Sequence, residues 1–180
     1  SPSNGRITVP RQTKDPIASL CPWPFTVMAR GLEYEVPAGG AADWLRVLMD
    51  TEHVSSEYMV LELVAGGAEL LMDEEISPEE IEELSLEMLE LAGGRPWYIT
   101  IRLVGVIHAN WNVLGAELLR YVDFTTMSLS GFLDVALLHA LRNMEENQIS
   151  MFVAELELPP PGVEIPVEEM EMSRDQFLSL

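Results

Sequence analysis

The sequence predicts a mainly α-helical fold: a compact helical bundle around a long central helix, with a small N-terminal β-hairpin and flexible ends. Three observations lead to this prediction. Apolar residues recur at helical spacing in several segments, helix-capping residues frame residues 77–94, and a long apolar segment follows Pro96. The chain has 180 residues, 48% of them hydrophobic, so it can bury one sizeable core.

The first 24 residues differ in composition from the rest of the chain. They hold five prolines, which oppose both helix and sheet, and three of the ten basic residues, Arg6, Arg11 and Lys14. We therefore predict an extended basic arm over residues 1–24. Two interpretations stay open: a disordered tail, and an arm lying on an acidic neighbour such as another copy of the protein.

Residues 25–158 are predicted to form a single, mostly helical domain that begins with the hairpin. The runs 25–29 and 32–36 are β-prone and flank Arg30 and Gly31, a pair suited to a tight turn. Apolar residues at helical spacing predict a short helix over residues 41–50. A second short helix is expected after Ser55 and Ser56, and it ends at Gly66 and Gly67.

The segment 77–94 carries the clearest helix signal. Ser77 is a favourable N-cap, Pro78 suits the first helical position and Glu80 completes a capping box. Glutamates occupy most of the remaining surface, and two glycines end the helix. The apolar stripe consists of Ile81, Leu84, Met88 and Leu91.

The expected central helix covers about residues 96–122. Apolar residues occupy most of its faces, which predicts burial by several neighbouring helices. Ile101 and His108 fall in one apolar stripe and Val113 in a second, and we interpret His108 as a hydrogen-bonded core residue.

Two more helices complete the predicted domain. Ser128 or Ser130 caps a helix over residues 129–144, and periodic apolar residues predict a last short helix around residues 149–156. The prolines and glycine of residues 159–162 end that helix. Residues 159–180 are predicted to be an acidic, proline-punctuated tail.

The formal net charge of the chain is −20. This charge repels nucleic-acid phosphates and anionic membrane surfaces, so neither is an expected partner. Fourteen acidic residues lie between Arg46 and Arg95, with no lysine or arginine among them. They form either a solubilising face or a docking face for a basic partner.

No residue pattern predicts catalysis, a cofactor or a metal site. His53, His108 and His139 lack the spacing of metal ligands, and Cys21 is the only cysteine. The paired glycines lack the spacing of a phosphate-binding loop, and the EF-hand pattern is not met. We therefore expect a protein that is not an enzyme and acts by binding other proteins. Without an apolar leader segment, a cytoplasmic location is expected.

Two segments supply candidate partner-binding residues. The helix over residues 77–94 would present an acidic face to a basic partner, and the C-terminal tail would offer adaptable apolar contacts, since methionine fits varied surfaces. Ordinary core filling is the alternative role for the chain's ten methionines. The candidates are Glu79, Glu82 and Glu83 on the helix and Met170, Met172, Phe177 and Leu178 in the tail.

Several short motifs also occur in a characteristic order. They are Gly-Arg-Pro-Trp-Tyr over residues 94–98, Trp111, Val-Asp before Thr125 and Thr126, Ser128 with Leu129, Leu133 with Asp134, Met-Phe at 151–152, and Pro-Pro-Pro-Gly at 159–162. Upstream, Gly31, Tyr34, Val36, Pro37, Ala42, Trp44 and Leu45 match in order. Over about residues 25–162 the chain resembles the tail assembly chaperones of long-tailed, siphovirus-type phages of actinobacteria. Trp97 and Tyr98 stand where that family commonly has two tryptophans.

The resemblance implies a factor of phage tail morphogenesis that works in the host cytoplasm and is absent from the virion. It would bind the tape-measure protein, keep it soluble and help recruit tail-tube subunits; self-association is also open. One alternative is a structural virion protein, a head–tail connector or minor tail component that binds neighbouring subunits through its arm and tail. Another is an acidic adaptor with no phage role.

Overall fold

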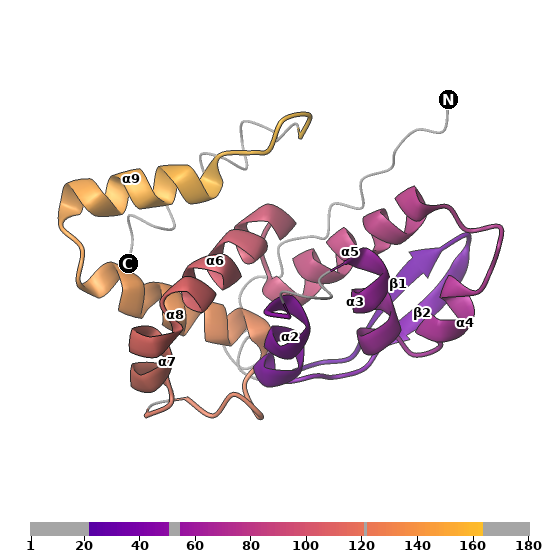
Figure 1. Ribbon diagram of the computed structural model, residues 1–180, viewed down its shortest axis with the longest axis horizontal. Helices are drawn as coiled ribbons and strands as arrows, with labels where there is room; N and C mark the ends of the chain where they lie inside the picture. The colour runs from indigo at the N-terminus through magenta and orange to yellow at the C-terminus, as the bar shows by residue number, and fades with distance from the viewer. Residues whose placement is uncertain (1–21, 51–54, 121, 164–180) are drawn as a thin grey trace. The chain divides into compact units, whose positions relative to one another are not determined.

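The structure is a computed structural model that describes residues 22–50, 55–120 and 122–163. It confirms a mainly helical fold with one small antiparallel hairpin near the N-terminus (Figure 1). The elements in chain order are β1 (Phe25–Ala29), β2 (Leu32–Val36), α2 (Ala41–Leu48), α3 (Ser56–Leu63), α4 (Gly67–Leu71), α5 (Pro78–Gly93), α6 (Trp97–Ala109), α7 (Trp111–Leu118), α8 (Leu129–Arg142) and α9 (Glu146–Glu157).

The chain divides into two compact units, residues 1–144 and residues 145–180. The expected single domain over 25–158 therefore spans the division, and its last helix belongs to the second unit. In that unit α9 begins with a capping box between Glu145 and Gln148, and Leu156 is its buried residue. Among the described residues, no helix is both long and apolar enough to cross a membrane.

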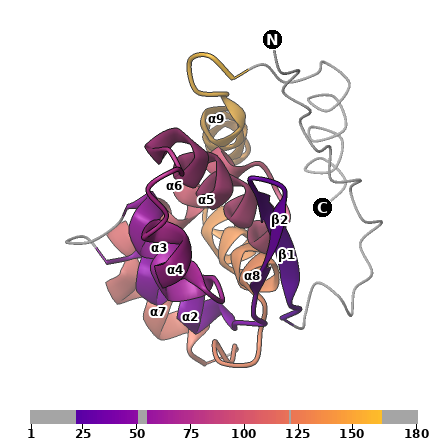
Figure 2. The same ribbon diagram turned by 90° about the vertical axis from the view of Figure 1, so that its right-hand side faces the viewer.

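The hairpin forms where the sequence predicts it. Arg30 and Gly31 have φ angles of 54° and 77°, the left-handed conformation of a two-residue turn whose twist matches the flanking strands. The strands pair in register from Phe25 with Val36 to Ala29 with Leu32. The hairpin lies along one side of α5 (Figure 2).

Helix α5 packs against α3, α6, α8 and β1, so it occupies the middle of the first unit. The predicted capping box is present: the Ser77 amide donates to Glu80 Oε2 over 2.8 Å, and the Glu80 amide donates to Ser77 Oγ over 3.1 Å. The buried face carries three of the four expected apolar residues, with Leu89 buried in addition. The buried apolar side chains are Ile81, Leu84, Met88 and Leu89.

A tight corner joins α5 to α6. Gly93 lies so close to Thr100 that a Cβ atom would overlap the threonine hydroxyl, and Gly94, with φ of 64°, lies against Ser130. Arg95 forms an ion pair with Asp134 of α8 and donates from Nε to the Gly93 carbonyl over 3.0 Å. The contacts at this corner therefore join α5, α6 and α8. The Thr100 hydroxyl is buried and has no hydrogen-bond partner within the described residues.

A second tie joins α2 to the loop before α8. The Ala41 amide donates to the Met127 carbonyl over 2.8 Å, and the Ala42 amide donates to the Phe124 carbonyl over 3.0 Å. Asp123 stabilises this loop by accepting from the amide and hydroxyl of Thr125, at 2.9 and 2.6 Å. These hydrogen bonds hold the pKa of Asp123 below its ordinary value.

The expected long helix over about 96–122 is two helices instead, α6 and α7, which meet at Asn110. The Asn110 side chain donates from Nδ2 to the Val106 carbonyl over 2.8 Å, a local bond that competes with continued helix. His108 is exposed, so its assignment to the core is wrong. Ile101 is 44% exposed and Val113 is 70% exposed, so these two residues also lie outside the core.

We predict opposite effects from alanine at two helical glycines. Gly93→Ala should lower the free energy of unfolding by about 1–3 kcal/mol, because its methyl group has no space beside Thr100. Gly105→Ala should raise it by roughly 0.5–1 kcal/mol, because nothing lies within 4 Å of the new methyl and alanine favours helix. Urea denaturation of both variants tests this; equal effects would show that the corner is not tightly packed.

Candidate protein-binding surfaces

The first unit carries its charge unevenly. Residues 55–94, which form α3, α4 and α5, contain twelve acidic residues and no lysine or arginine. Between residues 95 and 142, which form α6, α7 and α8, there are four arginines and three acidic residues. We call residues 25–36 and 55–94 the acidic lobe and residues 95–142 the neutral lobe. Within this unit the two sets of helices lie toward opposite ends (Figure 1).

Arginine from the hairpin partly compensates the acidic lobe. Arg30 at the turn forms ion pairs with Glu75 at 2.8 Å and with Asp73 at 3.4 Å. The hydrogen bond to Glu75 is the main reason that the pKa of Arg30 lies above its ordinary value. These exposed pairs tie the hairpin turn to the loop before α5, but each stabilises the fold only slightly.

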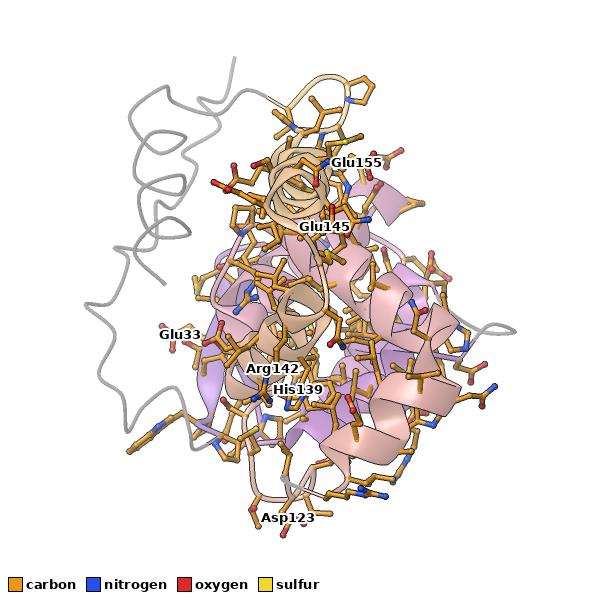
Figure 3. All side chains as sticks on the ribbon, turned by 90° about the vertical axis from the view of Figure 1, so that its left-hand side faces the viewer. Glu33, Asp123, His139, Arg142, Glu145 and Glu155 are labelled. Carbon is orange, nitrogen blue, oxygen red and sulfur yellow. The ribbon has the colours of Figure 1, made fainter. Side chains whose placement is uncertain are left out.

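The sequence-predicted Glu79, Glu82 and Glu83 lie in the first turns of α5, and all three are exposed. No ion pair from any described residue reaches them. Negative charge is favourable at this end of a helix because of the helix dipole. The structure thus leaves these carboxylates available to a basic partner. Glu33 of β2 also projects outward from the same lobe (Figure 3).

Two titration shifts report the environment of the acidic lobe. Partial burial raises the pKa of Glu87 above its ordinary value of 4.5, and the nearby Glu90 carboxylate raises it further. Desolvation likewise raises the pKa of Tyr58, followed by the negative charges of Glu62 and Asp50. For both groups burial is the main cause of the raised pKa, and neighbouring carboxylates add to it.

The neutral lobe exposes large apolar side chains on all three of its helices. Their exposed fractions range from 44% to 70%, and the acidic lobe also exposes four large apolar side chains, Met28, Leu32, Leu61 and Met72. Two ionisable side chains of the neutral lobe contact neighbours: His139 lies 3.8 Å from Glu117, and Arg102 lies 5.2 Å from the centre of the Tyr98 ring. The exposed apolar residues of the neutral lobe are Ile101, Val113, Leu119 and Leu138.

His139 and Arg142 lie close together on α8 (Figure 3). They are three residues apart, so they share one face of that helix. His139 faces Glu117 of α7 and helps join these two helices. Nothing in this arrangement suggests catalysis, and within the described ranges no group of three or more His, Cys, Asp or Glu side chains could hold a metal ion.

Sequence reasoning missed the apolar residues of the neutral lobe. It assigned Ile101 and Val113 to buried stripes and did not single out Leu119 or Leu138. Asn110, with Gly105 five residues before it, was the available signal that the helix is neither continuous nor wholly buried. The other predicted candidates, Met170, Met172, Phe177 and Leu178, lie outside the described residues.

Some of the motif residues singled out in the sequence lie where segments of the first unit contact one another. Gly94 and Arg95 form the corner between α5 and α6, Asp134 receives Arg95, and Ala42 bonds to the loop that contains Thr125. These motifs therefore describe the fold more directly than the binding surface. Comparison with protein-family models, with curated proteins and with solved structures finds no match to this chain.

We predict that Glu87→Gln stabilises the protein at pH 7. The folded state raises the pKa of Glu87, so it penalises the ionised form at neutral pH. That penalty disappears as the pH falls below the ordinary value of 4.5, and the variant's advantage should disappear with it. Thermal unfolding between pH 3.5 and 7 tests this against Glu82→Gln, an exposed control on the same helix. An advantage that persists at pH 3.5 would contradict it.

Proposed function

We propose that this protein is a phage tail assembly chaperone that binds the tape-measure protein and helps to recruit tail-tube subunits in the host cytoplasm. The resemblance over residues 25–162 suggests the family. The observation that carries the proposal is the pairing of exposed apolar helices in the neutral lobe with a strongly acidic lobe in the same unit.

The neutral lobe supplies the contact surface for an apolar helix. A tape-measure protein of long-tailed phages is a long helical chain, and its apolar stripes aggregate when they are exposed to water. Each large apolar side chain that is fully buried contributes about 1.5–3 kcal/mol, so burial of Ile101, Val113, Leu119 and Leu138 would favour binding and offset part of the cost of association. The near-neutral charge of this lobe avoids repelling an acidic stretch of the partner.

The acidic lobe has a different role. A complex of many chaperones on one long chain would precipitate if its outer surface were uncharged, and strong like charge keeps such assemblies dispersed. The same carboxylates offer a docking site for a basic partner, and Glu79, Glu82 and Glu83 are available for it. We assign tail-tube recruitment to this lobe because it is separate from the apolar side chains that would hold the tape measure.

Co-expression with a phage tape-measure protein tests the proposal. The expected result is a soluble tape measure that co-purifies with the chaperone, and an insoluble, unbound tape measure would refute the proposal. Mass spectrometry of purified virions provides a second test. The chaperone should be absent from them, and its presence at stoichiometric levels would support a structural virion protein.

Substitutions at two exposed apolar residues should show which lobe contacts the tape-measure protein. Val113→Glu, at a side chain 70% exposed, should reduce the soluble tape-measure yield about tenfold, because it places a charge in the apolar contact. Met72→Glu, at a side chain 82% exposed in the acidic lobe, is the matched control and should leave the yield unchanged. Equal losses from the two variants would contradict the assignment of the contact to the neutral lobe.

A further inference from the structure

Two arginines of the neutral lobe have side chains that form no ion pair with any residue the structure describes. Arg120 follows the end of α7 and Arg142 is the last residue of α8, and both are exposed. The ion pairs of the described residues involve neither of them. Acidic residues outnumber basic ones by 30 to 10 in this chain, so a shortage of carboxylates does not explain why these two arginines are unpaired.

The acidic residues of the same lobe already have interactions of their own. Asp134 forms an ion pair with Arg95. Glu117 faces His139 at 3.8 Å, and Asp123 accepts hydrogen bonds within its own loop. These three are all the acidic residues between positions 95 and 142. The charge that this lobe offers to a partner is therefore positive.

The contact between Glu117 and His139 joins α7 to α8. Exposed residues within about one helical turn of this contact border a common surface. Two of them are aliphatic, with exposed fractions of 70% and 60%, and the other two are the unpaired arginines. Figure 3 shows Arg142 beside His139 on this side of α8. We call this surface the α7–α8 face, and it consists of Val113, Arg120, Leu138 and Arg142.

Arginine beside exposed aliphatic side chains indicates the chemistry of a partner. A guanidinium group binds a carboxylate through two parallel hydrogen bonds, whereas aliphatic side chains favour an apolar surface that covers them. An amphipathic helix with Asp or Glu beside its apolar stripe supplies both features. A basic helix would face like charge at the arginines, and the net charge of −20 repels the phosphates of nucleic acid.

We propose that the tape-measure segment bound by the neutral lobe is an amphipathic helix with carboxylates beside its apolar stripe, and that Arg120 and Arg142 recognise those carboxylates. This inference rests on the proposed function and adds the chemical class of the bound segment. Val113 and Leu138 supply the apolar contact, while the two arginines determine which helices fit.

The acidic lobe reinforces this specificity by repulsion. Residues 55–94 contain twelve acidic residues and no lysine or arginine, so they repel a helix that carries carboxylates. Attraction on one lobe and repulsion on the other direct such a helix to the α7–α8 face. The uneven charge of the first unit thereby determines where an acidic amphipathic helix binds.

Charge reversal tests the arginines in the full chain bound to the tape-measure protein. Arg142→Glu should weaken binding about tenfold at low ionic strength, because it places like charge against a carboxylate. Arg46→Glu is the matched control: Arg46 is an exposed arginine of α2, outside both lobes, and its reversal changes the net charge equally. The control should weaken binding by less than about twofold. Equal weakening by the two variants would overturn the proposal.

A lysine at the same position identifies the group that it contacts. The chain has one lysine, Lys14, so Arg142→Lys adds a second site for carbodiimide coupling, which joins amines to carboxylates. Mass spectrometry of the coupled complex should find a link from position 142 to an Asp or Glu of the tape-measure protein, and Arg46→Lys should give none from position 46. Links from position 142 to carboxylates of this chain alone would overturn the proposal.

The outcomes distinguish this proposal from the proposed function. A tape-measure protein that the unmodified chain neither binds nor keeps soluble refutes both. A tape-measure protein that is bound equally well after Arg142→Glu leaves the chaperone function intact, but it overturns the assignment of an acidic helix to the α7–α8 face.

Discussion

Only residues 94–96 connect α5 to α6, and at this corner a Cβ atom on Gly93 would overlap Thr100 and one on Gly94 would meet the Ser130 hydroxyl. The close approach to Thr100 and Ser130 sets the position of α6 and α8 against α5, and the Arg95–Asp134 ion pair is formed at the same place. Since α5 also packs against α3 and β1, the positions of both lobes follow from this corner. A local steric constraint thus fixes how the helices of the first unit pack. The backbone hydrogen bonds between α2 and the loop at residues 124–127 fix the position of α2 in the same unit.

In this arrangement the residues that stabilise the fold differ from those whose side chains are exposed to a partner. The interior consists of ordinary aliphatic packing and the corner residues. Net negative charge gathers on the acidic lobe, whereas large apolar side chains are exposed on both lobes. They are Met28, Leu32, Leu61 and Met72 on the acidic lobe and Ile101, Val113, Leu119 and Leu138 on the neutral lobe. Negative charge on the acidic lobe has a local cost at Glu87, where burial raises the pKa of the carboxyl group and repulsion from Glu90 raises it further. The concentration of acidic residues on one lobe is consistent with a role in solubility or docking.

Local sequence signals predicted the elements that local interactions determine. Ser77, Pro78 and Glu80 specify the start of α5, and Arg30 with Gly31 specifies the hairpin turn, because each effect acts within a few residues. The apolar pattern after Pro96 could not reveal that the helix breaks at Asn110 or which faces remain in water, since both depend on how few neighbours pack there. Glu79, Glu82 and Glu83 were correctly expected at the surface, whereas the exposed apolar residues of the neutral lobe emerged only from the three-dimensional arrangement.

The central claim is that the neutral lobe binds an apolar helical partner through contacts that do not involve the acidic lobe. Hydroxyl-radical footprinting of the protein alone and in complex with the tape-measure protein measures this directly, because it reports side-chain exposure residue by residue. Ile101, Val113, Leu119 and Leu138 should become strongly protected in the complex, and Met72 should react as it does in the free protein. Unchanged reactivity at those four residues, or protection centred on Met72, would contradict the claim.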